Sequence, residues 1–552
     1  MKTVFSILAV LALLSTGLLP ATYYVATDGD DANPGTMALP LATMQQGHEL
    51  AAPGDTVYIR GGNYRIGANQ IARVEQNLFA CVSYFNKSGM PGQTIKFWAY
   101  PGEQPVFDFT DLAPANMRVV GIWVAGQYLH IKGLEMTGVQ VTITTHTESY
   151  CIYSRGSNNI YENISMHDNK GTGLRNYRGG GNLFLNCDAY RNHDDVSENG
   201  LGSNTDGFGS HSNPGVAPNI FRGCRAWFNS DDGFDIIRAD EPTVFENCWA
   251  FYNGYSPNFD ELGDGNGFKA GGYAHDPADQ IPNPVPRNTI QFCIAVRNKA
   301  NGFYANHHLA GNDWFNNSAY QNIDNFNMVN RESPEIDNIW FPGYDHVLTN
   351  NLSYNPRNLH ISWIDTALSD QTNNSFNLPI NLSASDFVSV EESLLTAPRN
   401  ADGSLPDITF LFPAEGSGVI DAGVDIGFPF VGNAPDLGAW ETDYPAGILP
   451  GDGTVPEGIN LFQNYPNPFN PGTEIRYSLA ESGTVTLIVY NSLGQKVSIL
   501  DNGYRTPGEF SATWNGRDEA GKPVASGVYF YRLTVAGISG YHTLMKKMTL
   551  LK

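Results

Sequence analysis

Four aspartates and one lysine recur beside glycine–aromatic steps in neighbouring segments of the chain. The aspartates are Asp206, Asp231, Asp232 and Asp235, and the lysine is Lys269. If each segment is one coil of a stacked solenoid with strands about 4.8 Å apart, Asp206 lies next to Asp232, and Asp235 lies next to Lys269. Carboxylates this close repel one another unless a cation neutralises them. The pattern therefore predicts a site for a hard divalent cation with a candidate base beside it.

The ligand types favour calcium and suggest a reaction. Oxygen-only ligands select Ca²⁺ or Mg²⁺ over Zn²⁺, and Ca²⁺ accepts irregular carboxylate shells. Ca²⁺ would also bridge the acidic site to a uronic-acid carboxylate and acidify the proton on carbon five of the sugar. Lys269 would remove that proton in its neutral form, and the oxygen on carbon four would leave, which is a β-elimination. The cation favours the neutral amine, whereas the aspartates oppose it.

Composition and charge restrict the class of protein. The chain has 552 residues, of which 16% are charged, 58 are Gly and 33 are Pro, as expected for many short strands and turns. The formal net charge of −24 argues against nucleic acid or an anionic membrane as partner. The same charge disfavours a polyanionic substrate unless a cation bridges the two. We expect a monomer.

A longer repeat predicts the fold, which is all-β. Short strands end in asparagine with spacings of 23 to 45 residues, at Asn169, Asn192, Asn229, Asn253, Asn298, Asn322 and Asn355. Such self-similarity is typical of a parallel β-helix, in which asparagine suits the left-handed corners and its amide stacks along the axis. The longer steps carry insertions, which we expect on one side as a binding surface, at residues 193–203, 254–265 and 272–287.

Four cysteines share one phase of this repeat: Cys187, Cys224, Cys248 and Cys293. We interpret them as a stack of small buried side chains. The alternative is that neighbouring pairs oxidise, because an exported chain can form disulfides.

Four segments are predicted along the chain. Residues 1–21 read as a signal peptide, with Lys2 before an apolar stretch. Residues 22–443 form the β-helix, closed by a strand at 436–441, and 444–457 is a Pro- and Gly-rich linker. Residues 458–552 predict a small Ig-like β-sandwich, with amphipathic strands at 484–490 and 528–535.

The tail carries a recognisable pattern. Residues 461–471, 490–495 and 527–531 resemble the C-terminal sorting domain of the type nine secretion system. The resemblance implies the outer-membrane secretion machinery as a partner, and a protein that is secreted or held on a bacterial cell surface. The alternative is a carbohydrate-binding or spacer sandwich.

The acidic motifs also resemble a known family. Residues 204–208, 230–235 and 265–272 are similar to polysaccharide lyase family nine, and the resemblance extends over residues 23–441. It implies a right-handed parallel β-helix that cleaves pectic polymers of the plant cell wall with Ca²⁺. It further implies that the four aspartates bind the metal and that Lys269 is the base. The expected substrate is polygalacturonate, or else rhamnogalacturonan or another acidic polysaccharide.

Several flanking residues are candidates for substrate binding, with a purely structural role left open. Arg175 shares the Lys269 position of the repeat and suits a uronate carboxylate, and the others on this face are Arg238, His275, Tyr304 and His307.

Two other functions compete with the lyase. A polygalacturonase-like hydrolase would use the aspartates as acid and base, but its Gly-His-Gly and Arg-Ile-Lys steps are absent from the chain. A non-catalytic, Ca²⁺-stabilised glycan-binding surface protein would have no use for Lys269.

Overall fold

The computed structural model describes two compact units, 1–444 and 445–552. In the first it describes residues 20–442, without 274, 275, 277, 334 and 335. In the second it describes residues 459–550, without 463, 465, 466, 468, 470, 471, 480–482, 492–494, 506, 507, 520, 538 and 539. The predicted linker and all but the last two residues of the predicted signal peptide lie outside the described residues.

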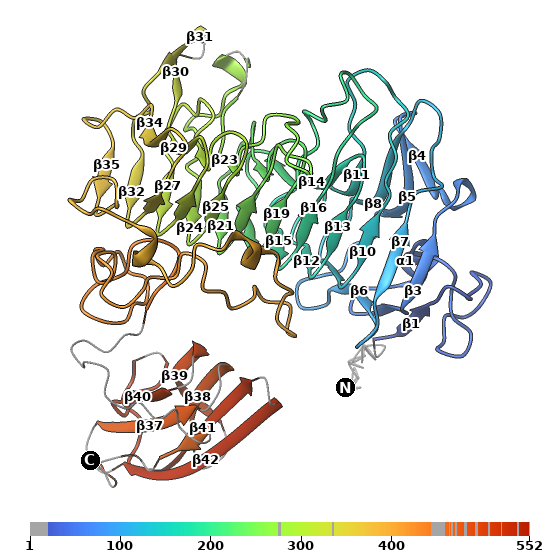
Figure 1. The fold of residues 1–552 in the computed structure, drawn as a ribbon. Coiled ribbons are helices and arrows are strands. Elements are labelled where there is room, and N and C mark those ends of the chain that lie inside the picture. The colour runs from blue at the N-terminus through green and yellow to red at the C-terminus, as the bar shows by residue number, and fades with distance from the viewer. Residues whose placement is uncertain are drawn as a thin grey trace, which may run out of the picture. The chain divides into compact units, whose positions relative to one another are not determined.

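The first unit is a right-handed parallel β-helix, as predicted (Figure 1). Successive coils place one strand in each of three sheets. Sheet 1 has twelve strands: β1 Thr22–Val25, β2 Thr56–Ile59, β6 Ile95–Ala99, β9 Leu129–Lys132, β12 Ile160–Glu162, β15 Leu183–Leu185, β18 Asn219–Arg222, β21 Thr243–Glu246, β24 Thr289–Gln291, β27 Asp313–Phe315, β32 Val347–Thr349 and β35 Asp370–Thr372.

Sheets 2 and 3 run alongside it. Sheet 2 has ten strands: β3 Gly62–Arg65, β7 Pro105–Asp108, β10 Glu135–Thr137, β13 Ser165–His167, β16 Asp188–Tyr190, β19 Arg225–Trp227, β22 Trp249–Phe251, β25 Ile294–Val296, β28 Ser318–Tyr320 and β33 Leu352–Tyr354. Sheet 3 has eleven: β4 Arg73–Glu75, β5 Phe79–Phe85, β8 Arg118–Val124, β11 Tyr150–Ser154, β14 Thr172–Arg178, β17 Phe208–Ser212, β20 Phe234–Asp235, β23 Phe268–Lys269, β26 Phe303–Tyr304, β29 Asp324–Asn327 and β34 Leu359–Ser362.

Shorter elements lie outside the three sheets. Helix α1, Met44–Leu50, packs against β5 near the N-terminal end, and β30 and β31 form a hairpin over Asn330–Ser333 and Ile336–Phe341. The 3₁₀ helices are η1 Ala68–Gln70, η2 Ala278–Gln280, η3 Ala384–Asp386 and η4 Glu392–Thr396.

Stacked phenylalanines set the register of sheet 3. Phe234 lies between Phe208 and Phe268, with ring centroids 5.1 and 4.9 Å away. Its neighbour Asp235 points outward, because side chains alternate along a strand. The glycine before each phenylalanine allows the coils to approach: a Cβ on Gly233 would lie 2.7 Å from the carbonyl oxygen of Gly267.

An asparagine ladder runs through the interior, as predicted. Each amide from Asn169 to Asn298 donates to the next asparagine at 2.9–3.0 Å. Two details differ from the prediction. The residue before each ladder asparagine takes the left-handed conformation, for example Tyr252 with φ 59°. The ladder also ends on Asn325 rather than Asn355, which is exposed.

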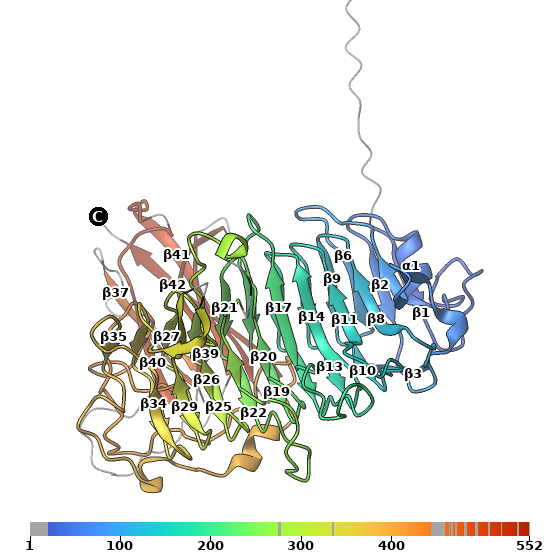
Figure 2. The same ribbon diagram turned by 90° about the horizontal axis from the view of Figure 1, so that it is seen from above.

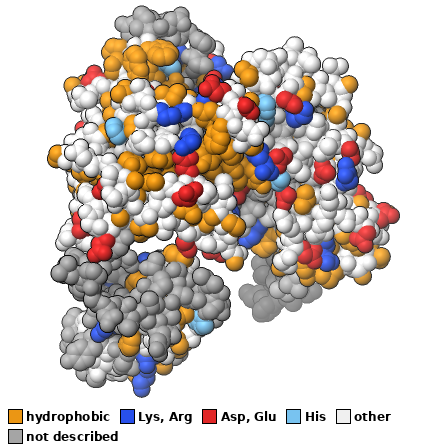
Figure 3. Space-filling model, viewed as in Figure 1, with side chains coloured by type: hydrophobic (Ala, Val, Ile, Leu, Met, Phe, Trp, Pro, Cys, Tyr) orange, Lys and Arg blue, Asp and Glu red, His pale blue; other side chains and the backbone are white. Residues whose placement is uncertain are grey.

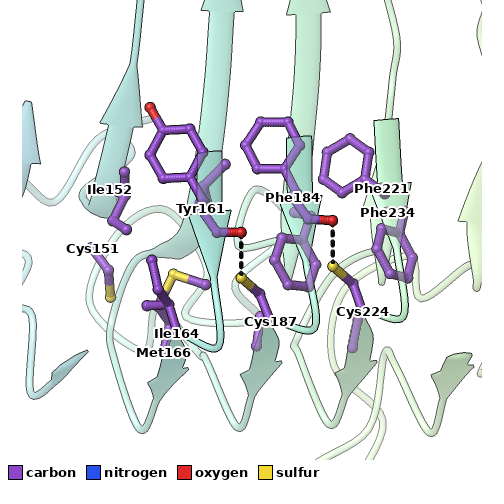
Figure 4. Close-up of a cluster of buried hydrophobic side chains, with 14 of the residues drawn as sticks. Cys151, Ile152, Tyr161, Ile164, Met166, Phe184, Cys187, Phe221, Cys224 and Phe234 are labelled. Carbon is purple, nitrogen blue, oxygen red and sulfur yellow. Dashed lines mark hydrogen bonds between the residues drawn. The ribbon is translucent and has the colours of Figure 1, made fainter. Parts of the chain in front are cut away.

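The cysteines form a buried stack and are free thiols (Figure 4). The Sγ atoms of Cys187 and Cys224 lie 3.4 Å from the carbonyl oxygens of Tyr161 and Phe184 on the preceding coils. Both side chains are fully buried. The interpretation as small core residues is therefore confirmed.

The insertions border sheet 3 on both sides, not on one side as expected. Residues 193–203 and 254–265 precede β17 and β23, whereas 272–287 follow β23. The first insertion thus borders β17 and the other two border β23, with β20 between these strands in sheet 3. Figure 2 shows β17 and β20 following β14 along the β-helix.

The predicted closing strand at 436–441 is wrong, because this segment is irregular. It is held by packing instead: Leu437 is buried with Phe410 and Leu352 against the outside of sheet 2. Farther back along the same C-terminal segment, Arg399 donates to both carboxylate oxygens of Asp188 in β16.

The second unit contains two antiparallel sheets around its own core, which agrees with the predicted Ig-like sandwich. One sheet contains β36 Asn460–Leu461, β37 Thr473–Leu479 and β40 Gly508–Trp514. The other contains β39 Lys496–Arg505, β38 Gly483–Asn491, β41 Gly527–Gly537 and β42 Gly540–Leu550. The two predicted strands lie inside β38 and β41.

Among the described residues, no helix has the length and apolar character needed to cross a membrane. On the face of the β-helix shown in Figure 3, acidic and basic side chains are interspersed, with hydrophobic side chains gathered near the middle. The negative charge of the chain is therefore not concentrated on this face.

Candidate active site

One outward row of sheet 3 carries the lysine and an aspartate. Strand pairing aligns Arg175 with Gly209, Gly209 with Asp235, Asp235 with Lys269, and Lys269 with Tyr304. The predicted adjacency of Asp235 and Lys269 is thus present in the structure. The stacked phenylalanines beneath fix this row, since each outward residue directly follows an inward ring.

Three carboxylates converge beside this row. Oxygens of Asp206, Asp232 and Asp235 all lie within 4.8 Å of one another, and the three residues are 7, 0 and 7% exposed. Backbone amides hold them: Asp206 Oδ1 accepts from the Asp232 amide at 3.2 Å, and Asp235 Oδ1 accepts from that of Ile237 at 2.7 Å. This group matches three of the four predicted metal ligands.

The fourth predicted ligand, Asp231, stands next to this cluster but is not one of the three converging groups. It is buried, and its Oδ1 accepts a hydrogen bond from the backbone amide of Asp264 at 3.0 Å. Burial raises the pKa of Asp231, and the charges of Asp232 and Asp206 raise it further.

The cluster is electrostatically unsatisfied by the protein alone. Burial, then the charges of Asp235 and Asp232, raise the pKa of Asp206 well above its usual value. Oδ2 of Asp232 is fully buried and accepts no hydrogen bond from any described residue, although Nζ of Lys269 lies 3.0 Å away. One ammonium faces four carboxyl groups, so the residues present fit a hard divalent cation that takes oxygen ligands.

Lys269 is held between two of these carboxylates. Its Nζ lies 3.0 Å from Asp232 and 3.1 Å from Asp235, and its side chain is 15% exposed. Burial favours the neutral amine, but the carboxylates, led by Asp232 and Asp235, outweigh it and raise the pKa of Lys269. The same ion pair holds the pKa of Asp235 below its usual value despite burial.

Two of the flanking candidates lie in the Lys269 row, and the others lie near it or are not described. Tyr304 is next to Lys269, with its hydroxyl 3.5 Å from Nδ1 of His307. Arg175 is paired with Glu148. Arg238, outside the row, is half-exposed and paired with Asp276 at 2.7 Å. His275 lies outside the described residues.

Sequence reasoning missed two residues that shape the site. Asn266 donates to Oδ1 of Asp232 through its backbone at 2.7 Å and its side chain at 2.9 Å. His211 is buried between Arg175 and Asp235, and its Nδ1 donates to the Ile237 carbonyl. Burial lowers the pKa of His211 to about 4, so it is neutral near pH 7. Extending the register two residues beyond Gly209 would have placed it here.

Comparisons with known proteins agree with this fold. Pectate lyase L of Dickeya dadantii (strain 3937) is 34% identical over 426 residues, covering 76% of this chain and 90% of that protein. The solved structure of a rhamnogalacturonan lyase matches with a TM-score of 0.68 and 40% identity, covering 72% of this chain and 97% of that one. The crystal structure of pectate lyase Pel9A matches with a TM-score of 0.62 and 33% identity, covering 77% and 97%.

Fold and relatives together define a β-helical polysaccharide lyase. The chain belongs to the family described as "Pel9A-like, right handed beta helix region", whose model matches residues 23–351. The hydrolase and the non-catalytic glycan binder are therefore set aside. Residues 471–540 match the model of the FlgD Ig-like domain, which supports the sandwich fold but says nothing of a secretion role.

Proposed function

We propose that this chain is a Ca²⁺-dependent lyase that cleaves a pectic polyuronate, with polygalacturonate as the principal substrate, by β-elimination. The observation that carries the proposal is the convergence of Asp206, Asp232 and Asp235 within 4.8 Å of one another beside Lys269. The pectate lyases among the relatives support the substrate class.

The protein's own residues divide the work. Asp206, Asp232 and Asp235, with Asp231 adjacent, would hold Ca²⁺. When bound, the ion would neutralise these carboxylates, attract the uronate carboxylate and acidify the proton on carbon five. Burial is then the main remaining influence on Lys269, and it favours the neutral amine that accepts a proton. Asn266 keeps Asp232 oriented through two hydrogen bonds.

The proposal is tested with polygalacturonate in the presence of Ca²⁺ or of a chelator. We expect unsaturated ends that absorb in the ultraviolet, formed with Ca²⁺ and lost with chelator. New reducing ends without this absorbance would contradict β-elimination. A parallel reaction with rhamnogalacturonan tests the second substrate, which is favoured by the 40% identity to a rhamnogalacturonan lyase.

We also propose that the chain is exported and that its C-terminal sandwich is a type nine sorting domain. The support is the sequence pattern of the tail, with the Ig-like fold as context. Fusion of residues 458–552 to a reporter carrying a signal peptide tests this in a bacterium that has the machinery. The reporter should reach the medium or the cell surface, and retention in the periplasm would contradict the role.

A further inference from the structure

A cationic pocket lies beside the active-site row, three to five strands before Lys269. It has a volume of about 320 Å³ and contains four arginines, Arg118, Arg155, Arg175 and Arg178, together with Tyr153 and Tyr177. They come from β8, β11 and β14 and their ends. We call this the arginine pocket. Its volume falls within the range of small-ligand sites, roughly 300–1,000 Å³.

The arginine pocket is positive in a chain whose net charge is −24. Glu148 is its one acidic lining residue, and it is paired with Arg175. Arg118 donates to the hydroxyl of Thr147 at 3.1 Å, and Arg155 and Arg178 lie 5.8 and 5.0 Å from the ring of Tyr177. These three guanidinium groups make no ion pair within the described part of the chain. Clustered cations without a counter-charge favour an anionic ligand.

A second pocket extends from the arginine pocket towards the strands that carry the acidic cluster. It also measures about 320 Å³, shares Arg175, Tyr177 and Arg178 with the first, and continues to His211 and Ile237. The amide of Ile237 donates to Asp235, one of the clustered carboxylates. The second pocket thus ends one residue-to-residue contact away from the acidic cluster, on neighbouring strands of sheet 3.

The strand register gives the spacing along this surface. Tyr153 pairs with Arg175, and the row continues through Gly209 and Asp235 to Lys269. Four strand steps of about 4.8 Å place Tyr153 about 19 Å from Lys269. Gly209 has no side chain of its own, and the ring of His211 and the side chain of Arg175 pack over it, with His211 Nε2 3.2 Å from the position of a Cβ there.

We propose that the arginine pocket is a subsite for an anionic sugar unit of the same polysaccharide, several units away from the bond that is cleaved. The proposal rests on the proposed function for the identity of the polymer. Guanidinium groups bind a carboxylate through paired hydrogen bonds, and the partly exposed ring of Tyr177 offers a face to a sugar, whereas Tyr153 is buried against Trp123 and Tyr150. A uronate offers both, whereas a neutral or methyl-esterified sugar leaves the arginines without a counter-charge. The pocket would thus favour long, unesterified polyuronate.

Binding without turnover tests the pocket separately from the reaction. In a Lys269→Ala background, the affinity for hexagalacturonate is measured by calorimetry with and without Arg155→Gln and Arg178→Gln. We expect binding to weaken about tenfold, because two guanidinium groups that would bind the sugar carboxylate are lost while Arg118 and Arg175 remain. The matched control is Arg222→Gln in sheet 1, where Arg222 is paired with Glu246 at 2.6 Å. It should leave the affinity unchanged.

The outcomes separate the two proposals. Unchanged affinity in the double variant, an equal loss in the Arg222 control, or an equal loss for methyl-esterified hexagalacturonate would overturn the pocket. Absence of hexagalacturonate binding in the Lys269→Ala protein would overturn it as well. If wild-type protein fails to cleave polyuronate while the affinity loss is observed, the reaction is wrong and the subsite stands. Thermal unfolding checks that the variants fold, and the single Arg178→Gln change at an exposed residue provides a second, milder variant.

Discussion

Nζ of Lys269 lies 3.0 Å from Oδ2 of Asp232, a fully buried carboxylate oxygen that accepts no hydrogen bond from any described residue. The two groups come from successive coils. Asp235, which lies on the same coil as Asp232, pairs with Lys269 in sheet 3. This contact links the proposed base to the proposed cation site, so each should depend on the other.

Replacement of Lys269 should separate catalysis from binding. Lys269→Ala removes the amine that we propose as the base. We therefore expect kcat to fall about 10²–10⁴-fold, the usual contribution of a general base. The measurement is the rate at which ultraviolet absorbance increases with polygalacturonate as substrate. Lys96→Ala on β6 of sheet 1 is the matched control and should keep full activity. Normal turnover in Lys269→Ala would refute the assigned role.

Ca²⁺ should stabilise the folded chain. A ligand that binds only the native state at one hundred times its dissociation constant adds about 2.7 kcal/mol to the free energy of unfolding. We expect a rise in melting temperature on adding Ca²⁺ that disappears with chelator and shrinks in Asp206→Asn. The exposed Glu415 supplies the control, Glu415→Gln, in which the rise should persist. An equal rise in Asp206→Asn would remove this residue from the metal site.

Interior asparagines should contribute strongly to stability. The amide of Asn253 donates to Ala226 and Asn298 at 3.0 Å each and accepts from Asn229, in a fully buried position. Asn253→Ala leaves these three partners unsatisfied at about 1–3 kcal/mol each, so we expect a loss of at least about 3 kcal/mol in the free energy of unfolding. Denaturant titration measures it. The exposed Asn258 serves as the control, where Asn258→Ala should change stability by less than about 0.5 kcal/mol.

How far the sequence predicts this molecule depends on the repeat. The Asp235–Lys269 pairing followed from residue spacing alone, because in a solenoid equal phases become neighbouring strands. The arginine pocket did not, since Arg118 and Glu148 come from coils where the repeat is weak. The contact between Arg399 and Asp188 joins residues 211 positions apart through an irregular segment, and no local pattern encodes it. Periodicity thus predicted the site, while the surfaces beside it required the fold.

Two buried histidines should make stability fall in acid. Burial is the main cause that lowers the pKa of His308 to about 4 and that of His346 to about 3, from an ordinary value of 6.5. The unfolded chain takes up these protons first, so stability is complete above about pH 6.5 and decreases as the pH falls towards 4. At pH 5 each histidine should lower the free energy of unfolding by about 2 kcal/mol.

Variants separate this effect from that of Asp206, because burial raises the pKa of Asp206 and so acts in the opposite direction. Denaturant titration from pH 7 to pH 5 should show a smaller decrease in His346→Asn than in the wild type. The exposed His146 is the control: His146→Asn should keep the wild-type decrease, and an identical slope in His346→Asn would show that the buried ring is not responsible.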